Sequence, residues 1–176
     1  MEHPVSPSRH ASMRLLLALP WILILVIIGV LWWSMSHVQK ASGHKERCEA
    51  NLTQIYKAVE LYALENNTLP SLAFFPESAQ RGPDSLIHVL RGYGLDPEHA
   101  LCPAAPDPVH WKGLSYVWNP SLNGKRFADL PDPIWMVVDI QAISGEVSPP
   151  HLGSYLILYT DGSIRETSEP PPMLRP

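Results

Sequence analysis

The sequence predicts an α+β fold, in which a long N-terminal helix packs its second half against a small antiparallel sheet. An uncharged apolar run extends from Leu15 to Trp33, and helically spaced apolar residues follow it without a Gly- or Pro-rich break. Further along, short β-branched and aromatic runs alternate with prolines and turn residues. We expect five segments: an N-terminal tail (1–14), a transmembrane anchor (15–35), an amphipathic helix (36–67), a small β domain (68–168) and a Pro-rich tail (169–176).

The apolar run is long enough to cross a membrane as a helix. At a rise of about 1.5 Å per residue, it matches a hydrocarbon core of roughly 30 Å. It exceeds the apolar part of a signal peptide, and Trp32 and Trp33 stand where a small-residue cleavage site would be needed. Tryptophan suits the membrane–water interface. We expect an uncleaved single-pass anchor, whose orientation the charges leave open because basic residues flank both ends almost equally.

The second half of the helix carries one apolar face, whose members recur at steps of three and four residues. They are Leu52, Ile55, Val59 and Tyr62. This spacing places them on one side of a helix, and we expect all four to be buried against the sheet. The pair Asn66-Asn67 and the following Pro70 predict that the helix ends between Leu64 and Asn67.

The β domain is expected to contain one short helix and three or four antiparallel strands. Asp84 is a candidate N-cap for a helix that extends to Leu90. The predicted strands are Leu114–Trp118, Ile134–Ile140, Tyr155–Tyr159 and Ser163–Glu166. Thr160 precedes Asp161 and Gly162 between the last two strands, which predicts a tight hairpin turn at Asp161 and Gly162.

The chain contains two cysteines, Cys48 and Cys102. An even pair outside the cytoplasm can form a disulfide, which here would join the helix to the proline-rich loop before the first strand. Two buried free thiols are the alternative. The sequence leaves both states open.

Several short motifs follow one another in a defined order. They are Cys48-x-x-Asn51-Leu52-x-x-Ile55, Cys102-Pro103, Ser115-Tyr116-x-x-Asn119, an apolar strand that ends in Asp139, and His151-x-Gly153 leading into Asp161-Gly162. Together they resemble type IV pilin-like proteins, and most closely the type II secretion pseudopilin-like group. The resemblance implies a non-enzymatic component of a secretion or pilus-type assembly in the bacterial inner membrane. Its N-terminus would be cytoplasmic, its C-terminal domain periplasmic, and its partners other pilin-like subunits or a secretion platform.

One segment departs from that family. Its members carry a Gly-Phe-Thr-Leu-Ile-Glu-like leader, which a peptidase cleaves after the glycine, where this chain has Ser12-Met13-Arg14-Leu15-Leu16-Leu17. No acidic residue occurs between Glu2 and Glu46. We therefore expect an intact N-terminus. The alternative function is a membrane-tethered periplasmic module that binds a ligand or a partner and has lost fibre assembly.

Few residues indicate chemistry. His151 and Asp161 are candidates for acid–base catalysis, but Asp-Gly is expected in the hairpin turn, so we predict no catalytic residue. The eight histidines form no HExxH pattern, and neither a metal nor a cofactor is expected. The resemblance leaves calcium as the one candidate ion, with oxygens from Asp107, Asp129 and Asp132, although these residues lack the alternating spacing of a calcium loop. The net charge of −4, without a basic stripe, argues against nucleic-acid binding.

Overall fold

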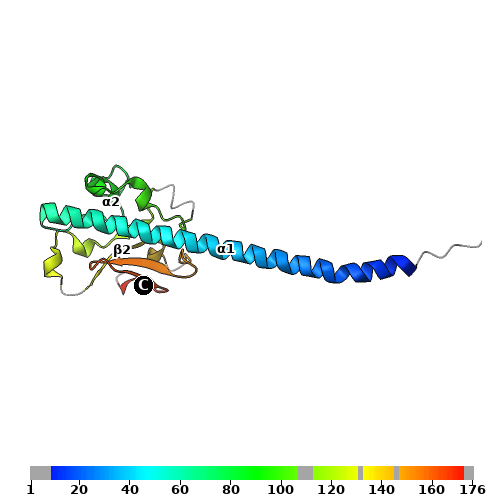
Figure 1. Cartoon of the computed structure of the whole chain (residues 1–176). Helices are drawn as coiled ribbons and strands as arrows, with labels where there is room; N and C mark the ends of the chain where they lie inside the picture. The colour runs from blue at the N-terminus through cyan, green and yellow to red at the C-terminus, as the bar shows by residue number, and fades with distance from the viewer. Residues whose placement is uncertain (1–8, 107–112, 131–132, 145–146, 173–176) are drawn as a thin grey trace, which may run out of the picture. The chain divides into compact units, whose positions relative to one another are not determined.

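The computed structural model describes residues 9–106, 113–130, 133–144 and 147–172. It has the predicted α+β fold, with a long N-terminal helix and a four-stranded antiparallel sheet (Figure 1). The regular elements are α1 (Arg9–Asn66), α2 (Leu86–Leu90), β1 (Tyr116–Trp118), β2 (Trp135–Asp139), β3 (Tyr155–Tyr159) and β4 (Ile164–Thr167). By its internal contacts the chain divides into two units, one up to Lys40 and one from Ala41 onward.

The first unit contains the N-terminal part of α1. This helix begins at Arg9, so residues 9–14 of the predicted tail are helical, and Pro20 lies inside the helix. From Pro20 onward α1 is long and apolar enough to cross a membrane, with a mean hydropathy of 2.0 in its most apolar window. The large apolar side chains from Trp21 to Trp33 are exposed in the isolated chain. Length and composition thus agree with the predicted anchor, as they would with a signal sequence.

In the second unit, α1 ends at Asn66, within the predicted range. Asn67 adopts a left-handed conformation with φ of 59°, a common way to terminate a helix. The short helix α2 starts later than expected. Its N-cap is Ser85 rather than Asp84, because the Ser85 hydroxyl accepts a hydrogen bond from the His88 amide at 3.0 Å.

The sheet has the strand order β1-β2-β3-β4, and each strand pairs antiparallel with the next. In the β1–β2 register Tyr116 lies opposite Asp139, so the two side chains share one face of the sheet. β3 and β4 form the predicted hairpin, with Asp161 and Gly162 in its turn. Gly162 has a φ of 78°, which a glycine adopts without strain.

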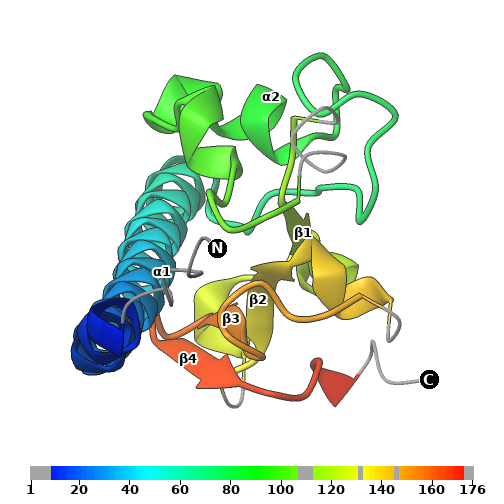
Figure 2. The same ribbon diagram turned by 90° about the vertical axis from the view of Figure 1, so that its right-hand side faces the viewer.

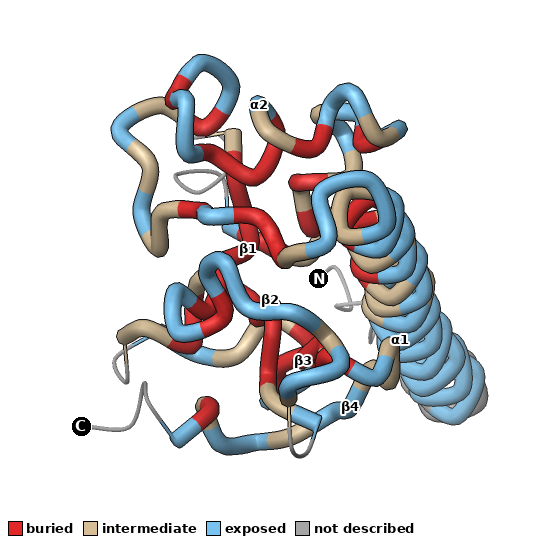
Figure 3. Tube along the Cα trace, turned by 90° about the vertical axis from the view of Figure 1, so that its left-hand side faces the viewer, coloured by how far each residue is buried: buried red, intermediate tan, exposed pale blue. Residues whose placement is uncertain are grey.

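The second half of α1 packs into the core of this unit. Figure 1 shows α2 and the sheet on different sides of the helix, Figure 2 gives the end-on view, and Figure 3 shows buried segments along β1, β2 and β3 and around α2. Leu52, Ile55 and Val59 are fully buried, in one cluster with apolar residues of β1, β2 and β3. Tyr62, which we expected to be buried, is only half-buried, and its ring packs edge-on against Tyr93 with 5.1 Å between ring centroids.

Candidate functional site

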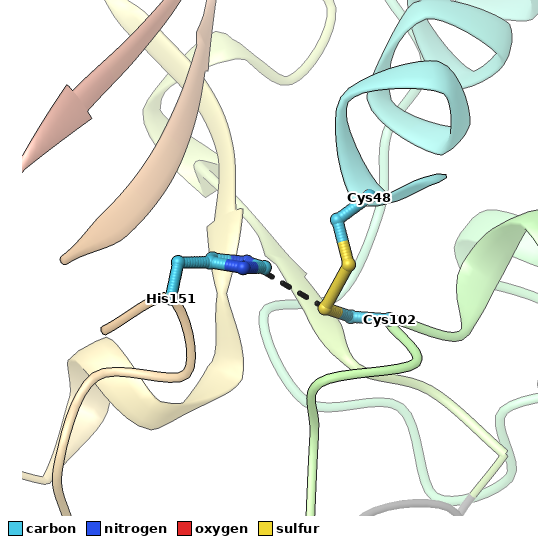
Figure 4. A group of neighbouring side chains, drawn as sticks. All are labelled: Cys48, Cys102 and His151. Atoms are coloured by element: carbon cyan, nitrogen blue, oxygen red, sulfur yellow. Dashed lines mark hydrogen bonds between the residues drawn. A yellow bond between two sulfur atoms is a disulfide. The ribbon is translucent and has the colours of Figure 1, made fainter. Parts of the chain in front are cut away.

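A disulfide joins α1 to the loop that follows the 3₁₀ helix η2 (Pro97–Ala100). Cys48 and Cys102 are both fully buried, and their Cα atoms lie 5.2 Å apart (Figure 4). Close by, the Asn51 side chain donates a hydrogen bond to the Leu101 carbonyl at 2.8 Å. Of the two states that the sequence leaves open, the structure has the disulfide. It fixes the second half of α1 against the loop that enters β1.

A histidine and an aspartate lie beside this disulfide in the core. His151 Nε2 is 3.4 Å from Asp139 Oδ2 and 3.6 Å from Cys102 Sγ, and Figure 4 shows its ring directed at that sulfur. Both the His151 and Asp139 side chains are fully buried. Asp139 ends β2, and its Oδ2 also accepts a hydrogen bond from the Leu156 amide at 2.8 Å. The arrangement therefore joins an acid, a base and a sulfur pair in a water-excluded environment.

A tight loop before β3 holds His151 in place. The backbone of His151 exchanges two hydrogen bonds with that of Ser154, each of 3.1 Å. Between them Leu152 and Gly153 both have positive φ values, as a two-residue type I′ hairpin loop requires. Leu152 is the exception to the usual glycine or asparagine there, and it is 80% exposed. The turn directs the His151 ring into the core, while the tip of the loop, at Leu152, faces solvent.

The His151 loop is also connected to α1 through polar contacts near the surface. Ser154 Oγ donates a hydrogen bond to Glu166 Oε1 at 2.5 Å, and Glu166 Oε2 forms an ion pair with Lys45 of α1. The hydrogen bonds from Lys45 and Ser154 lower the pKa of Glu166 below its usual value. Because the Lys45 and Glu166 side chains are partly exposed, their ion pair positions the loop more than it stabilises the fold.

Two buried polar atoms of the His151–Asp139 pair have no hydrogen-bond partner among the described residues. They are Asp139 Oδ1 and His151 Nδ1. An unpaired buried polar group costs about 1–3 kcal/mol, so two on one interacting pair are unusual in a well-packed core. Burial, with the nearby Asp139 carboxylate, raises the pKa of the Tyr116 hydroxyl, which keeps it neutral. This cluster of Cys48, Cys102, His151, Asp139 and Tyr116, which we call the buried polar cluster, is the candidate functional site.

The structure separates the two residues that the sequence offered for acid–base chemistry. Asp161 lies in the β3–β4 turn, where its Oδ1 accepts hydrogen bonds from the Ser163 amide and hydroxyl. These bonds lower the pKa of Asp161. The acidic neighbour of His151 is instead Asp139, which sequence reasoning noted only as the end of an apolar strand. The sequence feature that could have identified Asp139 is a carboxylate at the end of a buried strand, because a buried carboxylate needs a polar partner.

Of the three carboxylates considered for calcium, the structure describes only Asp129. Asp129 is exposed and pairs with Arg126, with 2.8 Å between Oδ2 and Nε. Asp107 and Asp132 lie outside the described residues. Two other groups could offer ligand atoms to a metal ion: the buried set Cys48, Cys102 and His151, and the more exposed set Asp96, Glu98 and His99.

A groove lies at the far end of α1, away from the buried polar cluster. It is lined by residues of the last turns of α1 and by the 3₁₀ helix η4 (Phe127–Asp129). Leu61 and Leu64 on its α1 side are exposed apolar residues, and Lys57, Glu60 and Arg126 contribute charge.

No protein-family model matches this chain, and neither a curated protein nor a solved structure is significantly similar to it.

Proposed function

We propose that this chain is a non-enzymatic, pilin-like component, of the pseudopilin-like kind, in a membrane-anchored secretion or pilus-type assembly. The observation that carries the proposal is that one helix has two roles. The segment of α1 from Trp21 to Trp33 is apolar and exposed, whereas Leu52 and Ile55 on the same helix are fully buried in the core of the second unit. One helix thus continues from the apolar segment into the core of the second unit. This continuity supports the resemblance that the order of the motifs indicates.

The apolar segment of α1 supports this proposal because it requires a cover. Contiguous apolar surfaces of this size are rarely left in water, and lipid or the helices of other subunits can bury them. A helix without charges from Leu15 to Trp33 serves both environments equally well. A pilin-like subunit would use lipid before assembly and neighbouring anchors after it.

For location, we propose the bacterial inner membrane with the second unit in the periplasm. The disulfide supports this orientation, because disulfides persist in oxidising compartments and are rare in the cytosol. Protease added to spheroplasts is expected to degrade the second unit. Protection of that unit until the inner membrane is lysed would contradict the orientation.

Site-specific photo-crosslinking tests the assembly role. A crosslinking amino acid is placed at Val26 in the apolar segment or at Leu64, which is 82% exposed beside the groove. We expect adducts from Val26 to other pilin-like subunits or to a second copy, and co-purification of a secretion platform. If Val26 gives only lipid adducts and no platform co-purifies, the assembly role is wrong.

The groove favours a second candidate function, a membrane-tethered module that binds a ligand or a partner. Its apolar walls at Leu61 and Phe127 offer a surface that an apolar peptide segment would fit. The same crosslinking experiment separates the two functions. Protein adducts at Leu64 without any at Val26 would favour the tethered module.

A further inference from the structure

The buried polar cluster has the composition of a soft-metal site. Two cysteine sulfurs and one imidazole nitrogen, all buried, lie within 4.8 Å of one another. A carboxylate oxygen of Asp139 lies 3.4 Å from the same imidazole nitrogen. Zinc and related ions bind thiolate, imidazole and carboxylate ligands in this combination. With the disulfide closed, the sulfurs bind each other and are not available as thiolates.

The distances in the cluster agree with the edges of a zinc tetrahedron. With Zn–S bonds of about 2.3 Å and Zn–N and Zn–O bonds of about 2.0–2.2 Å, tetrahedral geometry separates sulfur from nitrogen by about 3.6 Å. The same geometry separates nitrogen from oxygen by about 3.4 Å. The observed separations are 3.6 Å for Cys102 Sγ and His151 Nε2, and 3.4 Å for His151 Nε2 and Asp139 Oδ2. Two edges of such a site therefore exist already.

The sulfur–sulfur edge has to change, and the Asp139 carboxylate has to move closer to the sulfurs, because it does not belong to the group of ligand atoms that lie within 4.8 Å of one another. Two thiolates on one tetrahedral zinc ion lie about 3.8 Å apart, so the covalent bond between Cys48 and Cys102 must first be broken. Their Cα atoms, 5.2 Å apart, are held by α1 and by the loop after η2. Rotation of the cysteine side chains, with a small shift of that loop, can then separate the sulfurs.

The unpaired polar atoms of the cluster are a second, independent observation. Asp139 Oδ1 is fully buried and accepts no hydrogen bond from the described residues, although it lies on the carboxylate that faces His151 Nε2. An ionised carboxylate buried with an unused oxygen is costly, and a bound cation removes that cost. His151 Nε2 already points at both the carboxylate and the sulfur, so the ring needs no reorientation to bind a metal.

We propose that reduction of the Cys48–Cys102 disulfide opens a zinc-type metal site formed by Cys48, Cys102, His151 and Asp139. A dithiol reductant, such as the active site of a thiol–disulfide oxidoreductase, gives two electrons and two protons to the disulfide and becomes a disulfide itself. A divalent ion then replaces the two thiol protons, which pass to solvent, and His151 binds as a neutral ring through Nε2. Disulfide and metal are alternative crosslinks between the same two segments. This proposal does not depend on the proposed assembly role.

Cobalt binding tests the proposal, because Co²⁺ replaces Zn²⁺ and its thiolate complexes absorb in the near ultraviolet. The full-length protein, without a histidine tag, is reduced in detergent under anaerobic conditions, freed of reductant and titrated with Co²⁺. We expect one Co²⁺ per reduced chain with a thiolate-to-cobalt band that Zn²⁺ abolishes, and no such band in the oxidised protein. His151→Ala should weaken Co²⁺ binding at least about tenfold. Loss of a residue that only supports a metal ligand already costs about tenfold or more in metal affinity, and loss of a ligand should cost no less.

The other metal-competent group supplies a matched control. His99→Ala removes a histidine from the exposed Asp96 and Glu98 group and should leave the cobalt band and its affinity unchanged. Tryptophan emission, recorded in parallel, reports whether the reduced chain is folded. If reduction unfolds the domain, Zn²⁺ is expected to restore the folded emission. The proposal is overturned if the reduced protein gives no thiolate band, if His151→Ala binds Co²⁺ as tightly as the parent, or if the reduced chain stays unfolded with saturating Zn²⁺.

Discussion

At Gly162 the β3–β4 turn lies close to Tyr56 of α1. A Cβ atom added there would lie 3.0 Å from the ring of Tyr56, and this ring also packs against Phe127. Burial, with the nearby Glu60 carboxylate, raises the pKa of Tyr56 to about 12, consistent with a hydroxyl held in a packed position. The turn therefore needs glycine for two reasons, its φ of 78° and the absence of a side chain.

We predict that Gly162→Ala destabilises the protein more than Gly124→Ala does. Both glycines have positive φ values, 78° and 68°, so both variants incur the cost of a left-handed alanine. A Cβ at Gly124 meets no atom within 4 Å, whereas Gly162→Ala must also displace the Tyr56 ring. Overpacking of this kind costs about 1–3 kcal/mol. Denaturant unfolding followed by tryptophan fluorescence measures both variants, and equal losses would contradict the close contact.

A second pair of substitutions tests the buried face of α1. Ile55→Asp places an unpaired charge in the core and should cost several kcal/mol, enough to unfold a domain of marginal stability. Leu64→Asp changes the same helix where the side chain is 82% exposed, and should alter the free energy of unfolding by no more than about 0.5 kcal/mol. An Ile55→Asp variant with an unchanged melting temperature would contradict the packing of α1 on the sheet.

At the scale of the elements, the disulfide is the only covalent link between α1 and the rest of its unit besides the chain itself. It closes a loop with a sequence separation of 54 residues. Loop-closure entropy assigns such a crosslink about 4 kcal/mol if it is unstrained. We therefore expect the free energy of unfolding of the Cys48→Ala/Cys102→Ala double variant to be lower than that of the parent by up to about 4 kcal/mol. Denaturant unfolding measures it, with a chelator present so that metal binding does not contribute.

Thiol labelling of the native, membrane-extracted protein provides the companion measurement. After denaturation without reductant, the parent chain should react with no maleimide, and with two equivalents after reduction. Two reactive thiols before reduction would contradict the disulfide, and the periplasmic orientation would lose its main support.

Pattern and turn chemistry predicted most of the elements, because each element is specified locally. The Asn66-Asn67 pair ends α1, and the β-branched run at Trp135–Asp139 forms a central strand. The start of α2 was misplaced, since either Asp84 or Ser85 can cap a helix and only the Ser85 hydroxyl reaches the His88 amide. Tyr62 follows the helical period but packs against Tyr93, from the segment after α2, and stays half-buried.

The buried polar cluster was far less predictable, because it depends on contacts between elements. Asp139 and His151 meet only when β2 pairs with β3 and the loop at Gly153 turns the imidazole inward. Asp161 was the more obvious partner from the sequence, since it precedes a glycine in a recognisable turn. Local pattern identifies turns well, but it cannot determine which buried acid a histidine faces.

At the scale of the whole molecule, the contacts divide the chain at Ala41, and every member of the main core lies after that point. The second unit has its own sheet, its own disulfide and the Lys45–Glu166 ion pair. A core of this kind needs no contribution from the apolar segment. Full-length protein, in contrast, exposes that segment and should require lipid or detergent to stay dispersed.

We therefore predict that a truncated protein consisting of residues 41–176 folds without detergent and unfolds cooperatively with its disulfide intact. A shorter form that begins at Asn51 is the matched comparison, because it loses both Cys48 and Lys45 while keeping Leu52 and Ile55. It should be less stable by roughly the contribution of the disulfide, about 4 kcal/mol, with little added by the exposed ion pair. Urea unfolding of both forms measures the difference. The contrary outcome is that residues 41–176 fail to fold alone while the full-length protein is folded in detergent. The apolar segment would then contribute to the core, and the second unit would not be an independent folding unit.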